Sequence, residues 1–372
     1  MKALGHLLIV DLTTGKIDIE PFPVEWVHQY IGGRGVNSYL LYRDLTEKIS
    51  PLSEDNEIIF SCGLLTGTHM PASARLHVSG KSPLTDGLGS SNIGGEFGAK
   101  LRTAGFQTLI IKGKSEKPAY LYIEKDRAAL SDAGSLWGQD TRQSLQYLRK
   151  ELGSKDTEVL VIGPAGENLV PFATVMTEGG HAAGRTGMGA VMGSKNLKAV
   201  VVKSRIPKTE IDPAAKAAVR EYYQQILAAP RYKLFSKMSN TFVVGWAQEK
   251  GILATRNFQQ GTFNGTKRID GTDMLKHVVK RKSCYRCPVH CRAEFRIGSG
   301  PYAGATGERP DLEPTISLGS KCGLDDSDAI LYLHNLCNRL GVDSLSTGFD
   351  SVIALLGFIK SAGLNDVPHF SH

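Results

Sequence analysis

The apolar segments of this chain change character near residue 205, and this change constrains the fold more than any other feature. Before it, short apolar runs such as residues 57–60 and 108–111 are separated by turns that contain glycine, which is typical of strands. After it, apolar residues recur at helical spacing, as in residues 326–340, which is typical of amphipathic helices. We therefore predict an α+β fold, with a β-rich N-terminal region followed by an α-helical region.

The same patterns predict the individual elements. Strands are predicted at residues 7–10, 16–19, 57–60, 75–78, 108–111 and 120–123, and helices at residues 97–104, 141–152, 213–228, 326–340 and 347–362. The segment 204–208 is polar and contains proline, and Asp212 followed by Pro213 is a helix start with an N-cap and a first-turn proline. We therefore place the domain boundary here, which gives domains of residues 1–207 and 208–372.

The composition is ordinary for a folded protein. Of the 372 residues, 41% are hydrophobic and 22% are charged, which excludes a wholly disordered chain and a fibrous repeat. The longest apolar runs, such as residues 199–202, fall far short of the roughly 18 residues that a membrane-spanning helix needs. The N-terminal stretch predicts a strand and a hairpin turn at residues 11–15 rather than a secretory signal. We therefore expect a cytoplasmic location, no membrane partner and reduced cysteines.

Glycine is abundant, with 41 residues against a typical share of about 7%. It is concentrated in residues 32–35, 63–105 and 179–193. Such loops serve either as turns between short strands or as sites where backbone N–H groups approach an anion. These stretches also contain Arg34, Arg75, Arg102 and Arg185, which favour the second interpretation because guanidinium binds phosphate in a bidentate manner. Neither the P-loop nor the dinucleotide fingerprint is matched, so the pattern favours a phosphate-bearing cofactor of another kind.

Three cysteines in one short run are the sharpest chemical signal in the chain. Cys284, Cys287 and Cys291 have the spacing C-x2-C-x3-C, which allows three thiolates to converge on one centre from a single loop. This spacing suits either an iron–sulfur cube or a zinc ion. The candidates for a fourth ligand in this chain are Cys322, His290 and Cys337.

Positive charge is concentrated around these cysteines. Residues 267–292 contain eight Lys and Arg against two Asp, a net charge of +6 within a chain of +7. Flanking cations stabilise an anionic cluster and attract acidic electron carriers. The alternatives are a solvated basic surface beside a structural zinc, and a zinc-knuckle that binds nucleic acid. We expect no nucleic-acid partner, because stacking aromatics other than Tyr285 are missing from the patch.

Taken together and in order, these motifs resemble the tungsten- and molybdenum-dependent aldehyde:ferredoxin oxidoreductases. The matching segments are residues 32–35, 63–67, 81–85, 94–97, 162–168, 190–198, the cysteine run and 340–348. The resemblance spans essentially the whole chain. It implies an N-terminal domain of two sheets, later helical domains, a metal held by two pterins (tungstopterin or molybdopterin), and a nearby [4Fe–4S] cluster with Cys284, Cys287 and Cys291 as ligands.

The resemblance also implies roles for residues that hold the pterin. Arg75 matches an arginine between pterin and cluster, and Asn92 matches the residue whose backbone oxygen binds Mg between the two pterin phosphates. The remaining positions are Gly94 in the matching glycine motif, Ala182, Gly184 and Arg185 in the phosphate-binding segment, and Asp343, which matches an aspartate hydrogen-bonded to a pterin. One departure is that His181 stands where the family has an arginine.

The activity that the resemblance implies is oxidation of an aldehyde to a carboxylic acid. Glu313 matches an active-site glutamate suited to accepting a proton, and electrons would leave through the cluster to ferredoxin, an acidic carrier that docks near residues 276–286. Because chains of this family are longer, we expect the C-terminal part to be missing. The alternatives are an inactive fragment, a homodimer, or a second chain that completes the site. A different substrate is a further alternative: related subunits of aromatic-ring reductases reduce another class of substrate, and this activity stays open.

Overall fold

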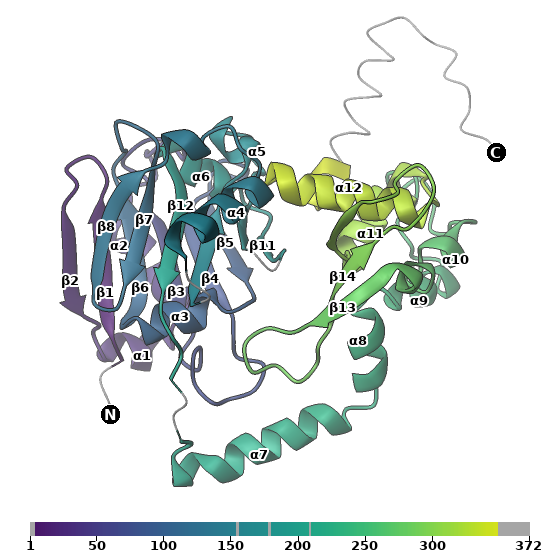
Figure 1. Cartoon of the computed structure of the whole chain (residues 1–372), viewed down its shortest axis with the longest axis horizontal. Helices are drawn as coiled ribbons and strands as arrows, with labels where there is room; N and C mark the ends of the chain where they lie inside the picture. Colours follow the sequence, from purple (N-terminus) through teal and green to yellow (C-terminus); the bar gives the residue numbers. More distant parts are fainter. Residues whose placement is uncertain (1–3, 154–155, 178–179, 208–209, 349–372) are drawn as a thin grey trace, which may run out of the picture. The chain divides into compact units, whose positions relative to one another are not determined.

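The structure is a computed structural model that describes residues 4–153, 156–177, 180–207 and 210–348. Its contacts divide the chain into two compact units (Figure 1). Unit 1 comprises Met1–Tyr232, Lys282–His290 and Asn338–Asp343, and unit 2 comprises Lys233–Arg281, Cys291–Cys337 and Ser344–His372. The cysteine run is therefore shared, with Cys284 and Cys287 in unit 1 and Cys291 in unit 2.

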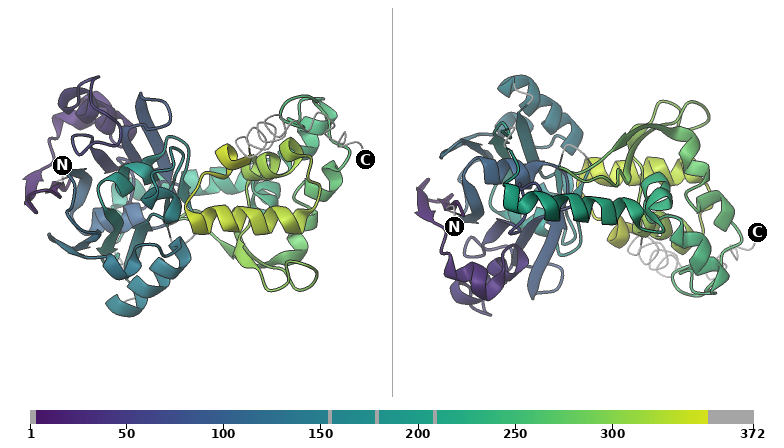
Figure 2. Two further views of the ribbon diagram at one scale, coloured as in Figure 1. Left: turned by 90° about the horizontal axis from the view of Figure 1, so that it is seen from above. Right: turned by 90° about the horizontal axis from the view of Figure 1, so that it is seen from below.

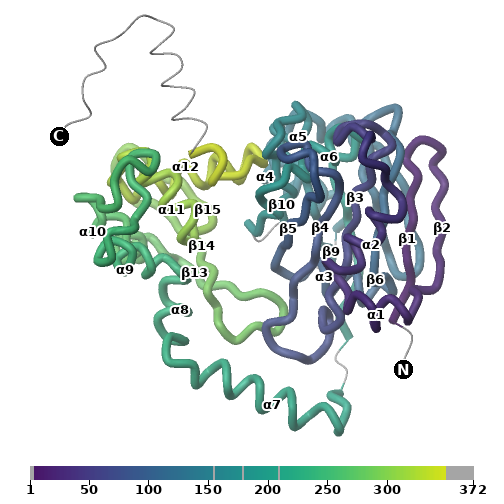
Figure 3. The backbone as a smooth tube through the Cα atoms, turned by 180° about the vertical axis from the view of Figure 1, so that it is seen from behind, coloured from purple at the N-terminus to yellow at the C-terminus, as the bar shows by residue number. Residues whose placement is uncertain are grey.

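The first sheet of unit 1 has six strands in the order β2-β1-β6-β3-β4-β5. The strands are β1 (His6–Asp11), β2 (Ile17–Pro21), β3 (Ile58–Cys62), β4 (Leu76–Lys81), β5 (Leu88–Ile93) and β6 (Phe106–Lys112). Strands β1 and β6 are parallel, and the other pairs are antiparallel. Figure 3 shows β3, β4 and β5 side by side in this sheet.

The second sheet of unit 1 also has six strands, in the order β11-β10-β9-β12-β7-β8. The strands are β7 (Ala119–Glu124), β8 (Arg127–Asp132), β9 (Thr157–Val161), β10 (Val175–Thr177), β11 (Ala182–Ala183) and β12 (Leu197–Lys203). One core joins the two sheets, since Leu8 and Phe60 of the first sheet belong to the same buried cluster as Leu121, Leu160 and Val200 of the second. The predicted two-sheet α+β fold is therefore confirmed.

Unit 1 also contains helices. They are α1 (Glu25–Tyr30), α2 (Arg34–Asp44), α3 (Phe97–Thr103), α4 (Thr141–Leu152), α5 (Pro164–Glu167), α6 (Met188–Ser194) and α7 (Pro213–Ala228), with a 3-10 turn η1 (Gly134–Leu136). All of these except α7 contain buried residues. Phe97 of α3 and Met188 of α6 lie in the core shared by the two sheets. Leu148 of α4 packs against Val159 and Val201 in a separate cluster, because α4 has its apolar residues on one face.

Helix α4 illustrates how the local sequence sets its own boundaries. Asp140 accepts a hydrogen bond from the Gln143 backbone N–H at 2.8 Å, and the Gln143 side chain accepts one from the Asp140 N–H at 3.0 Å. This reciprocal capping box satisfies two otherwise unpaired donors. At the other end Gly153 has φ 57°, a conformation that glycine adopts readily. The predicted helix at 141–152 is therefore confirmed residue for residue.

Unit 2 is mainly helical but also contains a small sheet. The elements that lie wholly or mostly in it are α8 (Tyr232–Met238), α9 (Val243–Glu249), α10 (Thr266–Ile269), η2 (Asp273–His277), β13 (Val278–Lys282), β14 (Arg292–Arg296), β15 (Thr306–Glu308), α11 (Leu312–Leu318), η3 (Ser320–Cys322) and α12 (Ser327–Leu340). Figure 2 shows α12 in yellow and α7 in teal. Ile269, Phe295, Leu318 and Ile330 lie together in one buried cluster. The three-stranded sheet β13-β14-β15 was not predicted from the sequence.

Two predictions about chain organisation are not decided. The predicted helix at 347–362 lies outside the described residues from 349 onward. The boundary between domains 1–207 and 208–372 stays a prediction, because the compact units are defined by contacts and not by independent folding. Within the described residues, no helix is both long enough and apolar enough to cross a bilayer.

Candidate cofactor site

Several loops that the sequence singled out meet at one end of the first sheet. Cys62 at the end of β3 pairs with Leu76 at the start of β4, and Leu76 pairs with Ile93 at the end of β5. Arg75 and Gly94, which flank these strands, therefore lie at the same sheet end. We call this region, with the loop 32–35, the strand-end site. The loop 32–35 joins it because the Gly33 N–H donates to the Cys62 carbonyl at 3.1 Å.

The strand-end site is rich in cationic and donor groups. The pKa of His77 on β4 is lowered, mainly by burial and further by the nearby guanidinium groups of Arg34 and Arg75. Its Nδ1 atom is buried and has no hydrogen-bond partner among the described residues. Glycine is needed here, because a Cβ built on Gly33 would lie 2.6 Å from the His77 ring. Two arginines beside an unpaired imidazole nitrogen suit an anionic, hydrogen-bonding ligand.

The segment 182–185 reaches the same strand from the second sheet. The hydroxyl of Ser91 on β5 donates to the Gly184 carbonyl and lies 3.1 Å from the Thr186 hydroxyl. Arg185 is exposed, and its guanidinium lies 3.5 Å from the buried carboxylate of Asp343. A Cβ on Gly184 would lie 2.9 Å from that carboxylate, so glycine allows the close approach. The structure thus brings Gly184, Arg185 and Asp343 together.

Asn92 and Ala182 are placed without a distinctive side-chain contact. Asn92 is half-buried on β5 and pairs with His77 across the sheet. Ala182 is exposed on β11, where its backbone pairs with Met176. The roles implied for both residues involve the backbone or a small side chain, and they stay predictions.

The first two cysteines of the run lie beside Gly94. A Cβ on Gly94 would lie 2.9 Å from the sulfur of Cys284, and the Tyr285 N–H donates to the Gly95 carbonyl at 3.1 Å. Burial raises the pKa of Cys287, while the positive charge of Arg75 acts in the opposite direction. Arg75, Gly94, Cys284 and Cys287 are therefore neighbours, although Arg75 and Cys287 are far apart in sequence.

The third cysteine and the predicted catalytic residue belong to unit 2. Cys291 directly precedes β14, and its carbonyl accepts a hydrogen bond from Arg309 at 3.0 Å. Glu313 is exposed in the first turn of α11, where its carboxylate accepts from the Asn240 side-chain amide at 3.4 Å. Within the described part of the chain, no group of three or more His, Cys, Asp or Glu side chains is arranged to hold a metal ion.

The candidates for a fourth ligand are divided between the units as well. Cys322 donates to the Ser317 carbonyl at 3.2 Å, and Cys337 is buried on α12; both belong to unit 2. His290 belongs to unit 1 and is exposed. All six cysteines are free thiols in the structure.

Some neighbours of the site were not found from the sequence. His77 lies two residues after Arg75 on β4, and alternation along the strand could have suggested it. Ser91 is hidden in a polar strand. Asn240 and Arg309 carry no local signal, because helix and hairpin packing brings each of them to its neighbour from a distant part of the chain.

Comparison with known proteins identifies the class to which this fold and site belong. The model of the aldehyde ferredoxin oxidoreductase N-terminal domain matches residues 7–204, and the model of domains 2 and 3 of the same proteins matches residues 217–365. The chain belongs to the aldehyde ferredoxin oxidoreductase family. This family consists of oxidoreductases, and membership implies, in general terms, a tungsten–pterin cofactor and an iron–sulfur cluster.

Individual relatives are similar over almost the whole chain. A tungsten-containing aldehyde ferredoxin oxidoreductase of Pyrococcus furiosus is 36% identical over 98% of this chain and 61% of its own length. A WOR-like subunit of aliphatic sulfonate oxidoreductase from the same organism is 32% identical over 92% of this chain and 57% of its own. The chain therefore spans about three fifths of the length of these relatives.

A solved structure has the same fold. A chain of the active-site complex BamBC of benzoyl coenzyme A reductase, bound to 1,5-dienoyl-CoA, superposes with a TM-score of 0.83 at 27% identity. The match covers 100% of this chain and 58% of that one. Its fold therefore occurs in enzymes with different substrates, and the family alone does not identify the substrate.

The residues present fit the groups that the family implies. For the pterin, the strand-end site offers guanidinium groups and the buried Nδ1 atom of His77, which has no partner among the described residues. Nearby, the absence of a side chain at Gly184 lets the backbone approach the Asp343 carboxylate, since a Cβ built on Gly184 would lie 2.9 Å from it. For an iron–sulfur cluster, the fit is one of ligand chemistry: Cys284, Cys287 and Cys291 are free thiols, and thiolate is the ligand that such clusters use, while no three such side chains of the described residues are grouped to hold a metal ion.

Proposed function

We propose that this chain binds a bis-pterin cofactor carrying tungsten or molybdenum, together with a [4Fe–4S] cluster, and takes part in oxidising aldehydes to carboxylic acids with ferredoxin as electron acceptor. The observation that carries the proposal is the meeting of Arg75, Gly94, Cys284 and Cys287 at the strand-end site, in a chain of this family.

The strand-end site would hold the pterin phosphates and their Mg ion. Arg34, Arg75 and Arg185 supply positive charge, and the Asn92 backbone oxygen would bind Mg. The Asp343 carboxylate lies against the backbone of Gly184 and 3.5 Å from the Arg185 guanidinium. These contacts would orient it to accept a hydrogen bond from a pterin N–H. The bound cofactor would supply a two-electron acceptor and a Lewis acid. The chain's part is to neutralise the phosphates and fix the orientation of the ring system.

Glu313 is proposed as the proton acceptor during aldehyde oxidation. Its carboxylate is exposed and is hydrogen-bonded by the Asn240 amide at 3.4 Å, while the other amide atom of Asn240 accepts from the Leu312 N–H at 2.8 Å. Asn240 is thereby anchored to the start of α11 and orients the carboxylate. We expect Glu313→Gln to lower kcat by about 10²–10⁴-fold, the usual contribution of general-base catalysis, with cofactor content unchanged.

The route for electrons would end at part of the basic region 267–292. Carboxylates neutralise several of its cations, among them Arg268 (by Asp325), Lys276 (by Asp273 and Asp328) and Arg292 (by Glu308 and Asp311). Lys280 and Arg281 on β13 are exposed and remain available to an acidic carrier. We expect Lys280→Glu to raise the KM for ferredoxin in a salt-dependent way, and Arg268→Glu to change it less.

Anaerobic purification followed by metal and sulfide analysis tests the proposal. The expected result is a brown protein that contains iron, labile sulfide, and tungsten or molybdenum, and that reduces a viologen dye when an aldehyde is added. Cys287→Ser should lose iron, whereas Cys322→Ser should keep it unless Cys322 is the fourth ligand. Zinc without iron, or salt-sensitive binding of nucleic acid, would contradict the proposal and favour the zinc-knuckle alternative.

A second candidate is a role as one subunit of a reductase that acts on a different substrate. The superposition with a chain of the BamBC complex over 100% of this chain favours it. The test is to supply benzoyl-CoA with a strong reductant, with and without the proteins that co-purify with this chain. Aldehyde-dependent dye reduction by a homodimer would decide for the first candidate, and CoA-thioester reduction that needs a second chain would decide for this one.

A further inference from the structure

Arg309 is brought next to a cluster cysteine by the hairpin of unit 2. Strand β14 begins at Arg292, directly after Cys291, and β15 ends at Glu308, directly before Arg309. The two strands pair antiparallel, with Glu294 opposite Glu308, and the Arg309 N–H continues the ladder by donating to the Ala293 carbonyl at 2.8 Å. A residue 18 positions along the chain is thereby fixed beside Cys291.

The guanidinium group of Arg309 is buried, and no carboxylate of the described residues forms an ion pair with it. The residue is 2% exposed. Its terminal nitrogens donate to two backbone oxygens, those of Lys237 at 2.9 Å and Cys291 at 3.0 Å, and its Nε atom has no partner among the described residues. Burial lowers the pKa of Arg309, yet a guanidinium stays charged in proteins. This is a buried, incompletely satisfied cation, which is costly unless an anion compensates it.

The nearby carboxylates do not supply this compensation in full. Glu308 and Asp311 lie close enough to act on the Arg309 charge, but both contact Arg292, at 2.8 and 3.3 Å. Arg292 and these two carboxylates form one charge group, and Arg281 and Arg292 both repel Arg309. An additional anion beside Cys291 would satisfy the remaining charge.

We propose that Arg309 is a positioning residue for the iron–sulfur cluster: it fixes the Cys291 backbone and places a buried positive charge that favours the reduced cluster. The inference rests on the proposed function, because Cys291 must be a ligand. Reduction adds one electron and makes the cluster more negative by one charge, so a fixed cation stabilises the reduced state more than the oxidised state. Net charge, hydrogen bonding and burial are the means by which proteins set cluster potentials.

The test is a redox titration of the cluster in the full-length holoprotein, followed by its EPR signal. Arg309→Met keeps the length and apolar stem of the side chain but removes the charge. We expect the equilibrium constant for reduction to fall about tenfold, a shift of about 59 mV to lower potential for a one-electron couple. Arg309→Lys keeps the charge and should titrate close to the parent protein. Arg268→Met, which removes an exposed arginine paired with Asp325, is the control and should not shift.

The outcomes separate this inference from the proposed function. A parent protein without iron and sulfide overturns the proposed function itself. A cluster whose potential is unchanged in Arg309→Met overturns only the role of Arg309. If Arg309→Met folds by circular dichroism but holds no cluster, Arg309→Lys decides: a cluster at the parent potential supports the role of the charge. Two results for a folded Arg309→Lys protein overturn that role. One is a cluster whose equilibrium constant for reduction is about tenfold lower than in the parent protein, and the other is the absence of a cluster.

Discussion

The two units bury their ionisable side chains in different ways. In unit 1, Lys195 and Lys198 are fully buried beside the sheets, and their ammonium groups donate to backbone carbonyls of Glu54, Gly113 and Gln139. In unit 2, the buried cation Arg309 and the Arg292–Glu308 pair, with side chains 14% and 4% exposed, lie on or beside β14 and β15, whereas the pairs Arg268–Asp325 and Lys276–Asp273 have side chains at least 40% exposed. Desolvation therefore dominates the energetics of the buried lysines of unit 1, whereas solvent screens these exposed pairs of unit 2.

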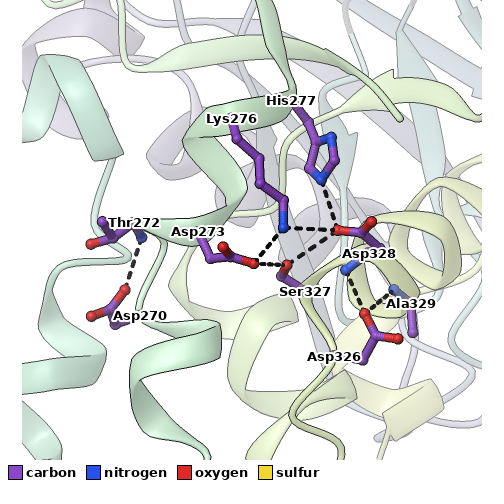
Figure 4. Close-up of polar contacts among 9 residues, drawn as sticks. All are labelled: Asp270, Thr272, Asp273, Lys276, His277, Asp326, Ser327, Asp328 and Ala329. Carbon is purple, nitrogen blue, oxygen red and sulfur yellow. Dashed lines mark hydrogen bonds and ion pairs between the residues drawn. The ribbon is translucent and has the colours of Figure 1, made fainter. Parts of the chain in front are cut away.

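The network at the start of α12 is the clearest example in unit 2 (Figure 4). The Lys276 ammonium lies 2.9 Å from Asp273 and 3.7 Å from Asp328. The His277 ring nitrogen lies 2.7 Å from the same Asp328 carboxylate, and the Ser327 hydroxyl donates to Asp273 at 2.5 Å. This hydroxyl bond is the main cause of the lowered pKa of Asp273. The network ties η2 to α12, and its ion-pairing side chains Lys276 and Asp273 are 52% and 40% exposed.

The largest expected effect comes from the buried ion pair of unit 1. Lys198 contacts the carboxylate of Glu167, and the two side chains are 0% and 4% exposed. The other carboxylate oxygen accepts from the Gly138 N–H at 2.8 Å. Lys198→Met would leave this carboxylate buried without its cation, so we expect a loss of about 3–5 kcal/mol in the free energy of unfolding, measured by urea denaturation.

The matched control for this prediction is the double variant Lys198→Met with Glu167→Gln. It removes both charges and keeps the hydrogen-bonding shape of Glu167, so it should recover a large part of the lost stability. If the single variant costs less than about 1 kcal/mol, the value typical of an exposed pair, the contrast between the two units is wrong.

The next effect is a pH dependence confined to unit 1. Burial raises the pKa of Glu57 from 4.5 to about 7, and its Oε2 atom has no partner among the described residues. Below the unfolded pKa the neutral carboxyl contributes stability, and this contribution is lost as the pH rises through the folded pKa. We expect the slope between pH 4.5 and 7 to reach at most about 1.4 kcal/mol per pH unit, and Glu57→Gln to abolish it.

Hydrogen exchange of sheet amides in unit 1 is the appropriate measurement for Glu57. His334 in unit 2 has its pKa lowered to about 4 by burial, so it gives a slope of the opposite sign that would mask the effect in a whole-chain signal. Lys195, whose folded pKa is lowered to about 8, titrates above the Glu57 window. An unchanged slope in the Glu57→Gln protein would show that this carboxylate is not the group responsible.

The sequence predicted the parts of this fold whose signal is local. Strands β3, β6 and β7 contain runs of Ile, Leu and aromatic residues, and helices α4 and α7 begin at capping aspartates. Strand β5, with the sequence LGSSNI, was missed because its polar residues have low strand propensity. It forms because β4 pairs along its whole length. The basic strand β13 was missed for the same reason.

The residues of the candidate site can likewise be divided into those with a local sequence signal and those placed by pairing between distant segments. The cysteine run was predicted from its spacing in the sequence, and Arg75 and Gly94 were predicted from the resemblance to the family. His77, Ser91 and Arg309 were not, because strand register and the β14–β15 hairpin set their positions. Residue contacts that depend on pairing between distant segments leave no periodic pattern in the sequence, so the chemical class was predictable while the surrounding polar contacts were not.

A smaller effect is expected in the network of unit 2. A double-mutant cycle of His277→Ala and Asp328→Ala isolates their 2.7 Å contact. Because the Asp328 side chain is 25% exposed, we expect a coupling energy of about 0.2–1 kcal/mol, weakened by added salt. A coupling above about 2 kcal/mol would mean that this network behaves like the buried pair in unit 1, and the comparison would fail.

The smallest effect concerns α7, which belongs to unit 1 but has no buried residue. Its N-cap Asp212 accepts from the Ala214 N–H at 2.8 Å. Asp212→Ala should cost the helix about 1 kcal/mol, seen as roughly fivefold faster exchange of α7 amides. The free energy of global unfolding should change by less than about 0.5 kcal/mol, as for a surface substitution.

Helix α4 is the control for the Asp212→Ala prediction, because it also begins at a capping aspartate but packs against a sheet. Asp140 caps it in the same way, but Leu145 and Leu148 of α4 are buried against the second sheet, and Asp140 also pairs with Arg339 at 2.7 Å. Asp140→Ala should therefore lower the stability of unit 1 as a whole. If Asp212→Ala did the same, α7 would have to be coupled to the core. If neither did, burial would not be what distinguishes these two helices of unit 1, because the cap would contribute equally little to a packed and to an exposed helix.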